Sequence, residues 1–212
     1  HLHLRQPELA AELFADLDDH ARAAAIYHEG GYLKRAAFQY AQAGDTEQAI
    51  QLYIALKQPE SAAQLAAESG DIDRAVAIWC DIDNCEHAAA LLVAEGRRAE
   101  GAALLESNEL IHAAAGLWSE VGEMEKAGQV FERANLWADA AQCYAQAGLT
   151  IKAAQAYFLA GEARQAADLY LKAGKPQKAL KIYVQLQSYR SIAEVYKQQG
   201  QWQKAGQAYL AA

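Results

Sequence analysis

The chain repeats one pattern of apolar and polar positions every thirteen residues. With Arg5 as position zero and a step of thirteen, position five is alanine in 14 of 16 units and position nine is aromatic in 13 of 16. Small or apolar residues fall at positions five, six, eight and nine, which is the spacing of one face of an α-helix. The alternation of a β-strand fits nowhere. The pattern therefore predicts one helix of about ten residues per unit, followed by a tight connection.

Prolines and polar residues indicate where each helix begins. Pro7, Pro59 and Pro176 all stand at position two, where the missing N–H costs nothing if that residue is the first of a helix. Position one holds a good N-cap residue in several units. These are Asp19, Asp45, Asp71, Asn84 and Ser188. We expect every helix to begin at position two.

Glycine at position zero doubles the period. It occupies seven of eight alternate units but only two of the eight interleaved ones. A glycine after a helix supplies the left-handed residue that ends it, so two kinds of connection and a 26-residue helical hairpin are predicted. The chain is expected to be an all-α, right-handed α-solenoid of about sixteen short antiparallel helices, forming one continuous array over residues 1–212. One long coiled-coil helix is excluded because recurring glycine and proline would break it, at roughly 1 and 3 kcal/mol each.

Three segments of the form Ala-x-x-x-Tyr-x-x-Ala carry a family resemblance. They start at Ala140, Ala153 and Ala166, and they look like the second-helix signature of tetratricopeptide repeats. The turns at Gly44, Gly70 and Gly122 are similar to the inter-helix turn of that family. The resemblance implies a scaffold that binds protein partners. The repeat is 26 residues rather than about 34, so the peptide-groove residues of the family are not carried across.

The ends of the chain fall inside the repeat. His1 stands at position nine of a unit whose front is missing, and Ala212 closes a unit at position twelve. We expect an interior fragment of a longer protein.

Charge and composition narrow the class of function. The 19 basic and 27 acidic residues give a net charge of −8, which argues against a basic nucleic-acid binder. No apolar run is long enough to span a membrane, and three cysteines do not make a disulfide framework, so a cytoplasmic location is expected. Residues 1–108 carry a net charge of −10 and residues 109–212 one of +2. This asymmetry is either drift on solvated faces or the basis of head-to-tail self-association.

Position four of the glycine-started helices is basic in six of eight units. These residues are Arg22, Arg74, Lys126, Lys152, Lys178 and Lys204. The interleaved helices lack this bias, so the cations are expected to form a ladder along one side that holds an acidic peptide or protein partner. The alternative is local pairing with carboxylates of the same first turns, such as Asp71, Asp73 and Glu125.

The pattern weakens between residues 57 and 108. Ala66, Leu92 and Leu105 replace the aromatic residue there. Two hypotheses follow, namely a change of curvature or a partner pocket near Arg97, Arg98 and His112.

Candidate chemistry is sparse. Cys80, Cys85 and His87 form a C-x4-C-x-H cluster, but no second cluster completes four metal ligands in a familiar spacing. No phosphate-binding loop, nucleophile elbow or H-E-x-x-H helix is present, so we predict neither an enzyme nor a bound cofactor or metal. The sequence favours a non-catalytic protein-protein interaction scaffold. The alternative is a structural spacer or self-assembling rod that presents domains located elsewhere in the full-length chain.

Overall fold

The computed structural model describes the backbone of residues 2–212 and the side chains from Pro7 onward, and in that part every regular element is a helix. The predicted all-α solenoid is confirmed. The sixteen helices are α1 (Leu2–Asp16), α2 (His20–Glu29), α3 (Leu33–Gln42), α4 (Thr46–Ala55), α5 (Pro59–Glu68), α6 (Ile72–Asp81), α7 (Cys85–Ala94), α8 (Arg98–Ser107), α9 (Ile111–Glu120), α10 (Met124–Arg133), α11 (Trp137–Gln146), α12 (Thr150–Leu159), α13 (Ala163–Lys172), α14 (Pro176–Gln185), α15 (Tyr189–Gln198) and α16 (Trp202–Leu210).

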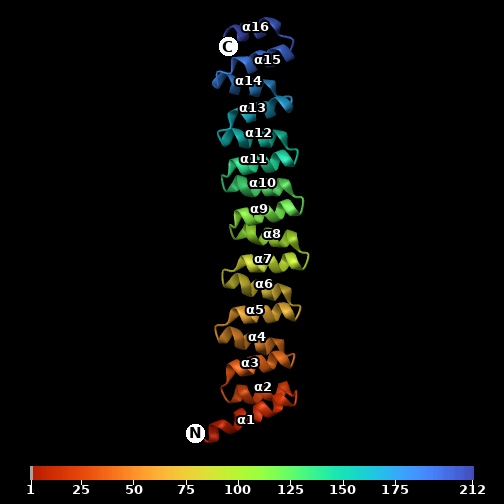
Figure 1. Ribbon diagram of the computed structural model, residues 1–212, viewed down its shortest axis with the longest axis vertical. Coiled ribbons are helices and arrows are strands. Elements are labelled where there is room, and N and C mark those ends of the chain that lie inside the picture. The colour runs from red at the N-terminus through yellow and green to blue at the C-terminus, as the bar shows by residue number, and fades with distance from the viewer. Residues whose placement is uncertain (1) are drawn as a thin grey trace. The chain divides into compact units, whose positions relative to one another are not determined.

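The chain divides into two compact units, residues 1–101 and residues 102–212. Inside each unit, consecutive helices pack on one another as antiparallel hairpins (Figure 1). One continuous array over the whole chain stays a prediction, and His1, on which the expectation of a missing front depends, lies outside the described residues.

The helix starts follow the predicted register. From α2 to α15 each helix has ten residues and begins thirteen residues after the one before it. Pro59 and Pro176 are the first residues of α5 and α14, as expected. The prediction for Pro7 is wrong, because α1 begins at Leu2 and runs through it. Proline holds φ near the helical value, so it removes a hydrogen bond without ending the helix.

Four of the five predicted N-caps are confirmed. The side-chain oxygens of Asp19, Asp45, Asp71 and Asn84 accept the backbone N–H three residues later, at N···O distances of 3.2 to 3.4 Å. The fifth prediction is wrong, because the Ser188 hydroxyl pairs with the Ser191 hydroxyl at 2.9 Å instead of capping α15.

The backbone makes the same turn after every helix from α1 to α15. Position zero has a φ between 52° and 87° in all of them, whether or not it is glycine. Six of these residues carry a side chain, namely Asp18, Lys57, Asp83, Glu109, Asn135 and Gln187. The following N–H then bonds the carbonyl of position nine, as in Asp45 to Tyr40 and Gln58 to Tyr53, both at 2.9 Å. The prediction of two kinds of connection is therefore wrong for the backbone. The 26-residue period belongs to the side chains.

Alanine contacts bring the helices together. The position-five residues Ala153, Ala166 and Ala179 have no exposed surface, and neither do most of their equivalents. The aromatic at position nine fills the space beside these contacts, and Tyr144 is only 2% exposed. At Gly128 a Cβ atom would lie 2.7 Å from the Tyr144 ring, so only glycine admits the ring there.

Enlarging one alanine contact should destabilise the fold. Ala153→Leu adds three carbons where no space is left, and we expect a loss of roughly 1 to 3 kcal/mol in the free energy of unfolding. Ala145→Leu on the exposed side of α11 is the matched control and should change little. Thermal unfolding followed by circular dichroism measures both, and equal melting of the two variants would contradict the core assignment.

The uniform turn predicts opposite effects for two substitutions at position zero. Gln187→Gly relieves the strain of a left-handed backbone conformation in a residue that carries a side chain. The entropy cost of glycine offsets part of this gain, so we expect the free energy of unfolding to rise by about 0.5 to 1 kcal/mol. Gly174→Ala should cost about 1 kcal/mol, although no atom lies within 4 Å of the added Cβ, because the cost arises in the backbone alone. Urea unfolding measures both, and shifts of the same sign would refute the argument.

Candidate functional site

The predicted cation ladder lies over aromatic rings. The Nζ of Lys126 is 4.4 Å from the centre of the Trp118 ring, and that of Lys152 is 5.5 Å from the centre of Tyr144. The same pairing joins Lys178 to Tyr170 at 5.1 Å, Lys204 to Tyr196 at 5.5 Å and, through its guanidinium carbon, Arg22 to Phe14 at 5.4 Å. In these five even-numbered helices the tight turn places position four over position nine of the helix before it. A cation above a ring face is attracted by the ring quadrupole.

Arg74 is the ladder residue that differs. Position nine of the preceding helix is Ala66, which offers no ring. Arg74 instead donates two hydrogen bonds to Glu47, one of them with an N···O distance of 3.2 Å, and so joins α6 to α4. The hydrogen bond from Arg74 lowers the pKa of the Glu47 carboxyl.

Ion pairs neutralise part of the ladder. Lys152 pairs with Glu125 at 2.7 Å, Lys126 with Glu123 at 3.8 Å and Arg22 with Asp19 at 3.0 Å. Within the described part of the chain, no carboxylate lies within 4 Å of the Lys178 or Lys204 ammonium group. Local pairing within one first turn therefore accounts for Arg22 and Lys126 only. Arg74 and Lys152 pair with carboxylates of another helix, and Lys178 and Lys204 have no carboxylate partner among the described residues.

Carboxylates at position ten of two even-numbered helices reach the aromatic residues of the ladder. Glu106 of α8 accepts the Trp118 Nε1–H at 2.8 Å, and Glu132 of α10 accepts the Tyr144 hydroxyl. Burial and this hydrogen bond raise the pKa of Tyr144, so its phenol is a donor at neutral pH. Sequence reasoning missed these carboxylates. The feature of the sequence that could have identified them is an acidic residue twelve positions before an aromatic residue.

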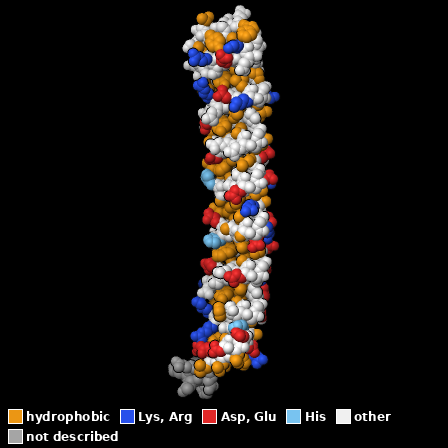
Figure 2. All heavy atoms as spheres, turned by 45° about the vertical axis from the view of Figure 1, so that its right-hand side comes forward, with side chains coloured by type: hydrophobic (Ala, Val, Ile, Leu, Met, Phe, Trp, Pro, Cys, Tyr) orange, Lys and Arg blue, Asp and Glu red, His pale blue; other side chains and the backbone are white. Residues whose placement is uncertain are grey.

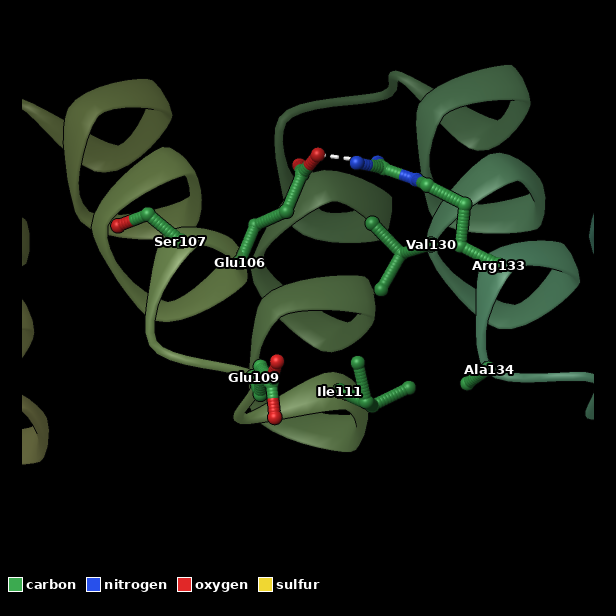
Figure 3. A pocket seen from close by; sticks show the side chains of 7 residues that line it. All are labelled: Glu106, Ser107, Glu109, Ile111, Val130, Arg133 and Ala134. Carbon is green, nitrogen blue, oxygen red and sulfur yellow. Dashed lines mark hydrogen bonds and ion pairs between the residues drawn. The ribbon is translucent and has the colours of Figure 1, made fainter.

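A cavity of about 470 Å³ lies in the second unit between α8, α9 and α10 (Figure 3). It is lined by Glu106, Ser107, Glu109, Ile111, Val130, Arg133 and Ala134. An ion pair between Glu106 and Arg133 spans it, so its strongest charges already satisfy each other (Figure 3).

The residues of the hypothetical partner pocket do not line this cavity. Arg97 pairs with Asp73 at 2.7 Å and with Glu100 at 2.6 Å. His112 packs edge-on against Phe131, with ring centres 5.6 Å apart. Both side chains are therefore engaged in contacts between helices.

Cys80 has the properties of a protonated thiol. Burial, followed by the contact with Cys85, raises the pKa of Cys80 to about 11. His87 stacks on Trp79 at 5.1 Å between ring centres, and its Nδ1 lies 2.8 Å from the Asn84 Oδ1. Among the described side chains, no three His, Cys, Asp or Glu residues group to hold a metal ion. The cluster thus offers no thiolate at Cys80 and no complete ligand set.

None of the described helices is both long and apolar enough to cross a membrane.

Comparisons with known proteins find helical repeats. The family model described as PPR repeat matches residues 167–191. Among solved structures, the TPR-like repeats of a kinesin light chain of Podosopora anserina are 14% identical, with a TM-score of 0.26, over 81% of this chain and 93% of that one. BtubC (BKLC) of P. vanneervenii is 16% identical, with a TM-score of 0.21, over 97% and 86%. A circular tandem repeat protein is 19% identical, with a TM-score of 0.15, over 97% and 56%.

No curated protein sequence matches the chain. The helical period, the buried alanine contacts and the local match to the PPR repeat model all indicate a helical repeat. The chain is a tandem array of helices similar to TPR-like and PPR repeats.

Proposed function

We propose that the chain is a non-catalytic scaffold in the cytoplasm that holds an acidic protein partner on the side of its even-numbered helices. The observation that carries the proposal is the ladder of cations, of which Lys126, Lys152, Lys178 and Lys204 each lie above an aromatic ring. The cations of the second unit recur every 26 residues, from Lys126 to Lys204, and match the repeating charges of an extended acidic segment. The three free cysteines support a reducing compartment.

Removing the ladder charges should weaken partner binding. A peptide-display selection against the whole chain is expected to enrich acidic sequences. Changing Lys126, Lys152, Lys178 and Lys204 together to Gln should weaken the selected peptides by roughly tenfold or more, because four exposed charge contacts are lost. Circular dichroism should show unchanged helicity.

The matched control changes Lys172, Lys175, Arg190 and Lys197 to Gln, which removes the same total charge away from the ladder. Fluorescence anisotropy measures both variants. If both variants bind the peptides equally weakly, the effect comes from net charge and not from the ladder. A selection that enriches no peptide would contradict the proposal.

A second candidate function is a self-assembling structural rod. It is favoured by the charge difference between the units, with 8 basic and 17 acidic residues in residues 1–101 against 11 and 10 in residues 102–212. Opposite potentials favour head-to-tail contact between two copies.

Salt separates this second function from a monomeric scaffold. If the rod forms through charge, the mass measured by light scattering should exceed that of one chain at low ionic strength. It should return to one chain near 1 M salt, where the screening length falls to about 3 Å. A single-chain mass at every salt concentration would contradict self-assembly and leave the scaffold proposal intact.

A further inference from the structure

The side of the even-numbered helices changes chemistry along the second unit. Position ten is Glu106 in α8 and Glu132 in α10, but Phe158 in α12 and Val184 in α14. Phe158 is 44% exposed and Val184 is 60% exposed. Two successive hairpins therefore present an apolar side chain where the two before them carry a carboxylate.

The aromatic residues next to these positions lose their acceptors as a result. Trp118 and Tyr144 donate to the chain's own carboxylates, Glu106 and Glu132. Their equivalents are Tyr170 and Tyr196, and neither hydroxyl forms a hydrogen bond to another side chain or to the backbone among the described residues. Tyr170 is only 7% exposed, so its ring is held in place with an unused donor.

The cations lose their partners over the same helices. Lys152 is neutralised by Glu125 at position three of the preceding even-numbered helix. The next two helices carry Ile151 and Gln177 at that position, which leaves Lys178 and Lys204 uncompensated.

The surrounding segment is strongly basic. Residues 163–212 contain eight basic and two acidic residues. Both carboxylates are engaged, since Tyr183 donates to Asp168 and Tyr209 to Glu194. Figure 2 shows basic and apolar side chains next to one another in this part of the second unit.

We propose that this surface binds a peptide that combines carboxylates with apolar side chains. We call it the α12–α16 face, and it consists of Phe158, Tyr170, Lys178, Val184, Tyr196 and Lys204. A ligand carboxylate accepts the Tyr170 hydroxyl beside Lys178, in the place that Glu132 takes against Tyr144, and a second does the same at Tyr196 and Lys204. Apolar ligand side chains cover Phe158 and Val184. The inference rests on the proposed scaffold function and assigns its site and the chemistry of its partner.

Peptide fits this surface better than single-stranded nucleic acid does. In proteins that bind single-stranded nucleic acid, the bases stack mainly on open faces of aromatic side chains. Here Lys178 lies 5.1 Å from the Tyr170 ring centre, and Tyr170 is 7% exposed, so the ring of Tyr170 has no face open to a base. The Tyr170 hydroxyl and the Lys178 ammonium group can still bind an acceptor oxygen of a ligand. The exposed Phe158 and Val184 favour apolar contacts.

The decisive experiment restores the chain's own carboxylates. The double variant Phe158→Glu and Val184→Glu places acceptors twelve residues before Tyr170 and Tyr196, as in the Glu132–Tyr144 pair. The probe is a fluorescein-labelled soluble peptide of Glu and Leu, titrated with the whole chain. We expect binding to weaken roughly tenfold or more, because the donors are occupied and the charge is neutralised. The control double variant Gln165→Glu and Gln198→Glu on odd-numbered helices has the same charge and should bind like the parent.

A second variant separates the hydroxyl groups from charge. Tyr170→Phe with Tyr196→Phe keeps the rings beneath the lysines and removes only the donors. We expect binding of the same probe to weaken about threefold to tenfold, with unchanged thermal unfolding. Peptides with Gln in place of Glu, or Ser in place of Leu, should bind more weakly than the probe.

Several outcomes would overturn the inference. These are parent-like binding by either double variant at the α12–α16 face, equal binding of the Ser peptide, or tighter binding of a polyuridine RNA that the same variants weaken. If display-selected peptides bind the whole chain but ignore these substitutions, the face is wrong and the scaffold function stands. If no peptide binds at all, both proposals fail.

Discussion

The contact between a helix and the next through a fully buried alanine is the constraint on which this structure depends. Ala153 and Ala166 have no exposed surface, so the backbones approach to a distance that no larger side chain permits. A one-residue insertion would rotate the alanine off the contact by about 100°. The thirteen-residue register is therefore kept along the chain, and each turn must be equally tight. Lys57 and Gln187 accept a left-handed backbone for that reason.

This constraint separates stability from recognition. Positions five, six and nine of each helix are committed to packing, whereas positions four and ten of the even-numbered helices lie at the edge of the contact. They can change without disturbing the register. Glu132 and Val184 occupy equivalent positions, and the helices around them have the same length and the same turn. A scaffold of this kind alters its surface one hairpin at a time.

The aromatic residues at position nine contribute both to packing and to the surface. Tyr144 contributes its ring to the core, its hydroxyl to Glu132 and its face to Lys152. The same side chain thus stabilises the array and positions a cation on its surface. Where the aromatic is absent, at Ala66, Arg74 pairs with Glu47 just as Lys152 pairs with Glu125, in each case with a carboxylate twenty-seven residues earlier. This ion pair between alternate helices therefore forms with or without a ring beneath the cation.

The sequence by itself determined the helix class, the starts of helices such as α5 and α14, most of the N-caps and the buried alanines. These follow from preferences acting within a few residues, and thirteen residues contain all of them. Only the tertiary structure decided that Gly174 and Gln187 make the same turn, that Lys178 lies over Tyr170, and that Glu125 neutralises Lys152 while no described carboxylate neutralises Lys204. Those contacts join residues eight, twelve and twenty-seven positions apart. Whether such residues meet depends on the angle of a turn and the closeness of two helices, and composition and periodicity do not specify either.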